Sequence, residues 1–332
     1  MTNSPAVARN HWAASVGAGA LAVVLFASSE WVPLAGIALC LASPLPVALA
    51  AARGGIAGAG VASLSGALGS LVLTGPIGSA VFTSQFAASG CALGLAARAR
   101  CSPEVVVGAY SIVAIAAFWA MLGVAGASTG IGGWGLLQGT VDQAVEAASE
   151  FLLRGESQPE AALAVQAWAE NARHLLPMAF PGLFALLATL TGWANCLLLR
   201  RLMGELRGAP WTQWRAPERW IWVLIASGLI ALFGGGPLGA TGLNIFIAAI
   251  GVYLLQGVAV VQSWFEAKGV PPLFRIAAYA LLFFQFPVTV LVAAVGAFDL
   301  WIDFRSRWTP RPPESTTPSS ENDDSPDRRR IP

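Results

Sequence analysis

The stretch Gly55-Ile-Ala-Gly-Ala-Gly-Val-Ala-Ser-Leu-Ser-Gly-Ala-Leu-Gly-Ser-Leu-Val-Leu73 decides the fold class, because it contains no charged side chain. A helix that crosses a bilayer needs about 20 mostly apolar residues. Hydrocarbon offers the backbone no hydrogen-bond partner, so only a helix or a closed barrel can cross it. The period-2 alternation that is typical of barrel strands is absent. The stretch therefore predicts a membrane-spanning helix.

Similar stretches recur along the chain and make up most of it. Hydrophobic residues account for 56% of the composition and Asp, Glu, Lys and Arg for only 11%, against about 25% charged residues in a soluble domain. The nine apolar stretches are 13–29, 31–52, 55–73, 77–97, 105–127, 175–199, 220–235, 243–265 and 273–298. We expect an all-α polytopic bundle of about eight or nine spans. The net charge of +1 argues against a nucleic-acid partner.

The same pattern divides the chain into five parts. Residues 1–12 are predicted to form an N-terminal tail, 13–127 a first group of membrane helices and 128–173 an insertion outside the membrane. Residues 174–308 form a second group of membrane helices, and 309–332 form a tail rich in Thr, Pro, Ser, Asp and Arg that we expect to be disordered.

The insertion is acidic and amphipathic. It contains six acidic residues and two arginines, and Val141, Val145, Ala148 and Leu152 recur at helical spacing. We expect two short helices on the outer surface, the second of which leads into the sixth span.

Lysine and arginine mark one set of alternate loops. Eleven of them lie at the N-terminus or in these loops, and the opposite loops contain only Arg154 and Arg173. Cytoplasmic loops are enriched in these residues, so we expect a cytoplasmic N-terminus in a bacterial inner membrane. The eleven are Arg9, Arg53, Arg98, Arg100, Arg200, Arg201, Arg207, Arg215, Arg219, Lys268 and Arg275.

The last apolar stretch has two interpretations. A single helix over 273–298, kinked at Pro287, would cross the membrane once, which we slightly favour. Alternatively, a break at Phe286-Pro287 would fold 272–307 into a hairpin and return the tail to the cytoplasm.

Glycine pairs at small-xxx-small spacing, Gly54/Gly58 and Gly90/Gly94, predict close helix packing in the third and fourth spans. The Thr74-Gly-Pro76 turn would join these spans as a tight hairpin. The alternative to packing alone is that this thin-walled pair lines a cavity or receives a partner helix.

Uncharged polar side chains occur within the later spans. They act either as interhelical hydrogen-bonding groups or as ligand contacts in a polar cavity. The candidate ligand contacts are Asn195, Asn244, Tyr253, Gln256 and Gln262.

The segment Gly296-Ala-Phe-Asp-Leu-Trp-Ile-Asp-Phe-Arg305 combines aromatic and charged residues at the end of the last stretch. Asp299, Asp303 and Arg307 would share one helical face. Either an interfacial anchor or a docking site for a partner or a cationic group would use such a face.

The sequence lacks the clustered ligands that a metal site needs and the paired groups that covalent catalysis needs. The four cysteines share no C-x-x-C spacing and the histidines are His11 and His174 alone. No paired nucleophile and base lie within a span. We therefore expect no metal, no cofactor and no enzymatic activity.

Three segments together resemble the YybS-like family of predicted bacterial membrane proteins. They are the segment with Pro44, Pro46 and Arg53, the segment from Asn244 through Gly257, and the segment with Gly296, Asp299, Trp301, Asp303 and Arg305. Members of that family are distantly similar to substrate-binding components of energy-coupling-factor transporters. The resemblance implies a small-molecule-binding transporter component or permease, lodged in the lipid bilayer, whose membrane partner supplies energy. A scaffold or assembly protein without transport is the alternative.

Overall fold

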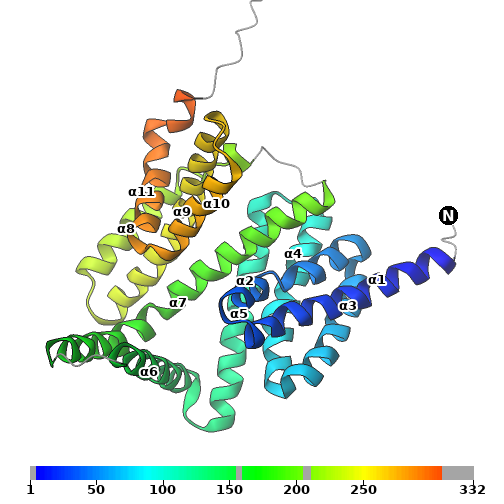
Figure 1. Ribbon diagram of the computed structural model, residues 1–332, viewed down its shortest axis with the longest axis horizontal. Coiled ribbons are helices and arrows are strands. Elements are labelled where there is room, and N and C mark those ends of the chain that lie inside the picture. Colours follow the sequence, from blue (N-terminus) through cyan, green and yellow to red (C-terminus); the bar gives the residue numbers. More distant parts are fainter. Residues whose placement is uncertain (1–4, 155–158, 205–210, 309–332) are drawn as a thin grey trace, which may run out of the picture.

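The computed structural model describes residues 5–154, 159–204 and 211–308, and every regular element in these ranges is a helix (Figure 1). The predicted C-terminal tail and Arg207 lie outside the described residues. The elements are α1 (Pro5–Trp31), α2 (Pro33–Leu41), α3 (Pro44–Val81), η1 (Phe82–Ala87), α4 (Ala88–Arg98), α5 (Pro103–Thr129), α6 (Gly132–Leu153), α7 (Pro159–Met203), η2 (Trp211–Gln213), α8 (Trp220–Phe233), α9 (Gly236–Ala267), α10 (Pro272–Phe284), α11 (Phe286–Ile302) and η3 (Phe304–Arg307).

The predicted all-α membrane bundle is confirmed, with a different count of spanning helices. Five helices are long and apolar enough to cross a membrane, or six if the bent α10–α11 pair is one span. One of the five is the 64-residue segment Ala35–Arg98, which as a straight helix would measure about 96 Å, three times the hydrocarbon thickness. This segment contains two of the nine apolar stretches, 55–73 and 77–97, and most of a third, 31–52. The 14-residue α8 is a shorter apolar helix.

The chain reverses direction twice within this segment, at two glycines with left-handed backbone. Gly55 has φ 64° and Gly75 has φ 74°, a conformation that residues with a Cβ rarely adopt. Beyond Gly75, Ser79 donates a hydrogen bond to the Ala67 carbonyl at 2.9 Å, and Ser63 contacts the Cys91 sulfur at 3.2 Å. The arms on either side of Gly75 are thus antiparallel, as the Thr74-Gly-Pro76 turn predicts.

Three of the four predicted packing glycines lie against another helical arm. A Cβ at Gly58 would overlap the Ala50 carbonyl, one at Gly94 the Ala48 carbonyl, and one at Gly90 would lie 2.6 Å from the Pro44 carbonyl. Gly54 is more open, with its nearest neighbour, the Ser15 hydroxyl, at 4.0 Å.

The insertion forms α6 and the first turns of α7, which pack side by side at the lower left of Figure 1. Val141 and Val145 on α6 are buried against Ala169 and Ala172 on α7. The second predicted helix runs into the sixth span without a break, as expected, since both belong to the 45-residue α7.

The predicted basic loops gather at one end of the bundle. Arg98 donates to the carbonyls of Ala52 and Arg53, at 3.2 and 3.0 Å. Trp214, in the connection between α7 and α8, donates to Glu104 at the start of α5 at 2.6 Å. This arrangement is consistent with the charge-based orientation, and the membrane face on which this end lies stays a prediction.

The α10–α11 pair differs from the single kinked crossing that we favoured from sequence. The two arms are bent by 104°, and both outer ends lie beside the C-terminal part of α9. Arg275 donates to the Phe265 carbonyl at 3.4 Å, and Trp308 donates to the Ser263 hydroxyl at 3.2 Å. The pair therefore corresponds to the hairpin alternative.

The break in this hairpin has a local cause. Pro287 has no N–H to donate to the preceding turn, and Gln285 is extended, with φ −113° and ψ 96°. The Thr289 hydroxyl donates to the Leu282 carbonyl at 2.6 Å, which supplies a partner that the interrupted helix would otherwise lack.

We predict that Gly94→Val destabilises the bundle whereas Gly60→Val does not. A side chain at position 94 must displace the α3 backbone near Ala48, while position 60 has no atom within 4 Å of an added Cβ. Overpacking of this kind costs about 1–3 kcal/mol. Thermal unfolding of both variants in detergent, followed by fluorescence-detected size exclusion, measures the difference. Equal melting temperatures would contradict the close packing of these helices.

Candidate ligand-binding site

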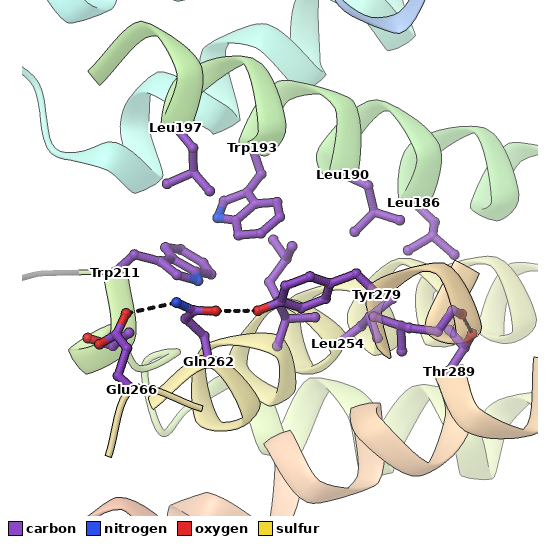
Figure 2. Close-up of a pocket in the computed structure, with 14 residues that line it drawn as sticks. Leu186, Leu190, Trp193, Leu197, Trp211, Leu254, Gln262, Glu266, Tyr279 and Thr289 are labelled. Atoms are coloured by element: carbon purple, nitrogen blue, oxygen red, sulfur yellow. Dashed lines mark hydrogen bonds between the residues drawn. The ribbon is translucent and has the colours of Figure 1, made fainter. Parts of the chain in front are cut away.

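A cavity of about 790 Å³ lies among α7, η2, α9, α10 and α11. Its body is apolar, and its polar groups, apart from Thr289 at the other side, lie toward the C-terminal ends of α7 and α9 (Figure 2). The lining residues are Leu186, Leu190, Trp193, Leu197, Trp211, Thr212, Leu254, Leu255, Val258, Gln262, Glu266, Tyr279, Leu282 and Thr289.

A chain of hydrogen bonds crosses the polar end of this cavity. The Tyr279 hydroxyl of α10 donates to Gln262 Oε1 at 2.5 Å, and Gln262 Nε2 donates to Glu266 Oε1 at 2.8 Å. Gln262 and Glu266 are one helical turn apart on α9, so they project from the same face. The chain fixes the orientation of the Gln262 amide and connects α10 to α9 (Figure 2).

Two tryptophans face this polar chain from α7 and η2. The Trp193 and Trp211 rings are 4.6 Å apart between centroids and are tilted by 57°. Both indole Nε1 atoms are buried and have no hydrogen-bond partner among the described residues. Buried donors are rarely left unpaired in native proteins, so these two N–H groups are candidates to bond an acceptor on a ligand.

A second cavity, of about 360 Å³, lies on the other side of the tryptophans. Trp193, Trp211 and Leu255 line both cavities. Trp211 also stacks on Trp214, with centroids 5.1 Å apart and an angle of 13°. These aromatic side chains therefore form a partition between the two spaces.

Asn244, a predicted ligand contact, instead connects α9 to α7 beside the Pro181 position. The Gly182 N–H donates to Asn244 Oδ1 at 2.6 Å, and Asn244 Nδ2 donates to the Met178 and Ala240 carbonyls at 2.8 and 2.7 Å. Pro181 cannot donate a backbone hydrogen bond, so this amide supports a weakened turn of α7. The geometry corresponds to the interhelical hydrogen-bonding alternative.

Asn195 is buried, and it also bonds backbone. Its Nδ2 donates to the Leu41 carbonyl, where α2 ends, and to the Thr191 carbonyl, both at 2.9 Å. Tyr253 is 2% exposed, and its hydroxyl has no hydrogen-bond partner among the described residues. Of the five predicted contacts, only Gln262 lines the 790 Å³ cavity.

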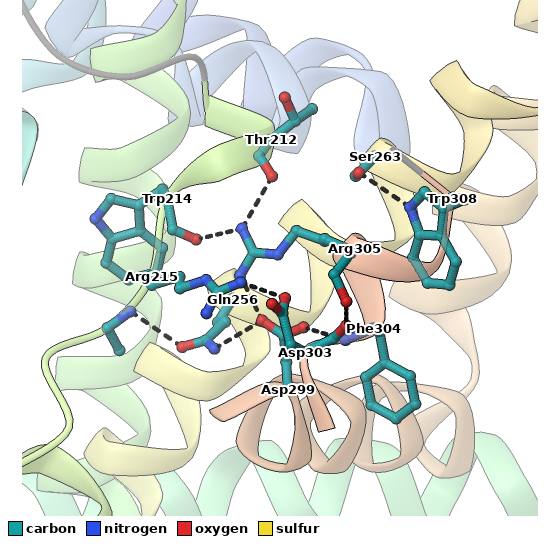
Figure 3. A network of polar contacts seen from close by, with 12 residues as sticks. Thr212, Trp214, Arg215, Gln256, Ser263, Asp299, Asp303, Phe304, Arg305 and Trp308 are labelled. Atoms are coloured by element: carbon teal, nitrogen blue, oxygen red, sulfur yellow. Dashed lines mark hydrogen bonds and ion pairs between the residues drawn. The ribbon is translucent and has the colours of Figure 1, made fainter. Parts of the chain in front are cut away.

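Gln256 belongs to a buried polar network at the end of α11 (Figure 3). Gln256 Oε1 accepts a hydrogen bond from the Ala216 N–H at 3.0 Å, and its Nε2 donates to Asp299 Oδ2 at 3.2 Å. The same carboxylate oxygen pairs with Arg305 at 2.5 Å, and Oδ1 accepts from the Phe304 N–H at 3.1 Å. Asp299 has no exposed surface.

Arg305 connects this network to η2 and to the segment between η2 and α8. Its guanidinium donates to the Thr212 and Trp214 carbonyls at 2.9 and 2.8 Å. Arg215 in the same segment forms an exposed ion pair with Asp303, which caps α11 with left-handed φ of 45°. Because Trp211 and Thr212 line the cavity, the C-terminal motif holds one of its walls in place.

The remaining motif residues are structural or face outward. A Cβ at Gly257 or Gly296 would overlap a carbonyl of the other helix, so both glycines permit close contact of α9 and α11. Pro44 and Pro46 are buried at the start of α3, and Arg53 is exposed. Trp301 is 61% exposed, which suits an interfacial aromatic residue.

Most of the residues that line the cavity are not predictable from the sequence. Trp193, Trp211, Glu266 and Tyr279 come from four elements far apart in the chain, and no spacing rule joins them. The available signal was the pairing of Gln262 and Glu266 at one-turn spacing near the end of an apolar helix. Among the described residues, no group of three His, Cys, Asp or Glu side chains is placed to hold a metal ion.

The sequence matches the model of one protein family. The family model described as "Predicted membrane protein (DUF2232)" matches residues 20–300, which include most of the helical bundle and the cavity. No curated protein and no solved structure matches the chain.

We predict that Arg305→Met strongly destabilises the protein, whereas Arg215→Met has little effect. Removing Arg305 leaves the Asp299 carboxylate buried without its ion pair, and breaking a buried pair costs about 3–5 kcal/mol. Arg215 forms an exposed pair with Asp303, with 45% of each side chain accessible, and such pairs contribute about 0–1 kcal/mol. Denaturation in detergent compares the two variants. Similar stability of Arg305→Met and wild type would show that the network does not hold this end together.

Proposed function

The chain belongs to the DUF2232 family of predicted membrane proteins, and we propose that it binds a small amphipathic molecule within the bilayer. The 790 Å³ cavity carries this proposal. Its volume lies within the range of ligand pockets, about 300–1,000 Å³. Its composition also fits, since a mostly apolar wall ends in a few convergent polar groups.

Ligand orientation would follow from the distribution of polar groups. The apolar part of the ligand would lie along Leu186, Leu190 and Leu254, which face one another across the cavity from α7 and α9. Its polar group would lie beside Gln262, where the two indole N–H groups that have no partner in the described part of the chain are also found.

The proposed role is that of a substrate-binding transporter component or permease-like protein. The resemblance to the YybS-like family and, distantly, to energy-coupling-factor substrate-binding components supports this role. We propose that a separate membrane partner supplies the energy and that the chain itself is not an enzyme. On the positive-inside rule, the basic end of the bundle would face the cytoplasm of a bacterial cell, with the protein in the inner membrane.

A scaffold or assembly function is the second candidate. The end of α11 favours it, because Phe298 and Trp301 are 54% and 61% exposed and their rings lie 6.1 Å apart. Next to them is the exposed Arg215–Asp303 pair. A photocrosslinker at Trp301 that captured only lipid, and no protein, would argue against this candidate.

We predict that Leu190→Trp abolishes ligand retention whereas Leu187→Trp preserves it. Leu190 lines the cavity, so the larger side chain would fill the space that a ligand needs. Leu187 lies on the same helix but is 50% exposed outside the cavity, so it controls for the added indole. Native mass spectrometry of protein purified from its own membrane detects retained small molecules.

The outcome of this experiment shows whether the cavity binds a ligand or is only a gap in the helix packing. A retained molecule in wild type and Leu187→Trp, but not in Leu190→Trp, supports the proposed function. A molecule retained equally by all three proteins, or by none of them, contradicts the assignment of the cavity.

A further inference from the structure

We propose that the ligand of the 790 Å³ cavity is a hydrophobic cation, that is, an amine, quaternary ammonium or related organic cation with an apolar body. This inference rests on the proposed function, because it specifies the charge class of the molecule that the cavity takes. Three independent features of the polar end point to it.

The first feature is the charge of the cavity wall. Glu266 is the one formally charged side chain among its fourteen lining residues, and no lysine or arginine lines it. The described residues form ion pairs at Arg173–Asp142, Arg215–Asp303 and Arg305–Asp299, none of which involves Glu266. The carboxylate is therefore available to a cationic ligand.

The described cations beside the cavity bond other groups than Glu266. Arg305 donates to the carbonyl of the lining residue Thr212, but its ion pair is with Asp299. Arg275 precedes Tyr279 by one turn of α10, but its guanidinium donates to the Val270 and Phe265 carbonyls, at 2.8 and 3.4 Å. Lys268 caps α9 and is exposed. Within residues 5–154, 159–204 and 211–308, no cation pairs with Glu266, so an anionic ligand would face this carboxylate without compensation from these residues.

The second feature is the aromatic surface around the polar end. Trp193 and Trp211 form a tilted pair on one side, and Tyr279 lies beside the Gln262 amide on the other (Figure 2). The faces of tryptophan and tyrosine rings attract cations within about 6 Å, and aromatic groups of this kind recognise quaternary ammonium ligands.

The third feature is the direction of α9. Glu266 and Gln262 lie in the last two turns of this 32-residue helix, where the helix dipole places partial negative charge. The dipole adds to the charge of Glu266 and favours a cation at the same position. All three contributions favour positive charge at this position. The Trp193 and Trp211 N–H groups are hydrogen-bond donors, so they would bond an acceptor atom elsewhere on the ligand rather than its cationic group.

Tetraphenylphosphonium and tetraphenylborate test the inference, because they have the same shape and opposite charge. We would measure the binding of each ion by titration calorimetry to protein in dodecyl maltoside, with protein-free micelles as the blank. We expect saturable binding of tetraphenylphosphonium at least about tenfold tighter than that of tetraphenylborate. Leu190→Trp should abolish the saturable binding.

Glu266→Gln is the variant that isolates the charge. The amide oxygen can still accept the hydrogen bond from Gln262 Nε2, so the cavity keeps its shape while losing its negative charge. We expect tetraphenylphosphonium affinity to fall about five- to tenfold. Glu170→Gln, an exposed position on the insertion part of α7, should leave the affinity unchanged.

The possible failures are distinguishable. Equal binding of the two ions, or unchanged affinity in Glu266→Gln, overturns the cationic ligand class; if Leu190→Trp still removes binding, the cavity remains the binding site. Absence of saturable binding of either ion also overturns the inference. Only failure of the native mass spectrometry comparison of Leu190→Trp with Leu187→Trp overturns the proposed function itself.

Discussion

Hydrocarbon offers no hydrogen-bond partner, so each interruption of a helix in this bundle needs a partner from within the protein. Near Pro181 in α7, the Asn244 amide of α9 bonds both the Gly182 N–H and the Met178 carbonyl. Near Pro287, the Thr289 hydroxyl bonds the Leu282 carbonyl. Asn244 and Thr289 thus supply hydrogen bonds to backbone groups at interrupted helical turns. Few other polar groups in these apolar helices are left to bond a ligand.

Buried charged groups in this bundle also need partners from within the protein. A buried carboxylate is tolerated only when it is paired and hydrogen-bonded, and Asp299 satisfies both conditions through Arg305, Gln256 and the Phe304 N–H. Arg305 in turn bonds the Thr212 and Trp214 carbonyls. The network therefore links the end of α11 to the segment that contributes Trp211 and Thr212 to the cavity. Glu266 differs from Asp299 in having no cationic partner within the described part of the chain, which is why it is the better candidate for contact with a ligand.

Sequence patterns predict those parts of this structure that depend on local properties. Apolar stretches of about 20 residues identify the helices, and the Thr74-Gly-Pro76 turn identifies a reversal. Helical spacing on the insertion identifies the buried face of Val141 and Val145. The cavity was not predictable in this way, because Trp193, Trp211 and Tyr279 meet only through the packing of separate elements. Asn244 and Gln256 were ambiguous for a related reason: a buried amide looks the same in the sequence whether its partner is a ligand or a distant backbone group.

The α10–α11 hairpin returns the chain to the basic end of the bundle and places α10 over the cavity, so the arrangement depends on where its two ends lie. Labelling with a membrane-impermeant maleimide tests this directly in a background without native cysteines, using Lys268→Cys, Ser306→Cys and Gln138→Cys. We expect positions 268 and 306 to react from one side of the membrane and position 138, on α6, to react from the other. Reaction of position 306 from the same side as position 138 would show that 272–302 crosses the membrane once, and it would contradict the hairpin and the cavity wall that the hairpin forms.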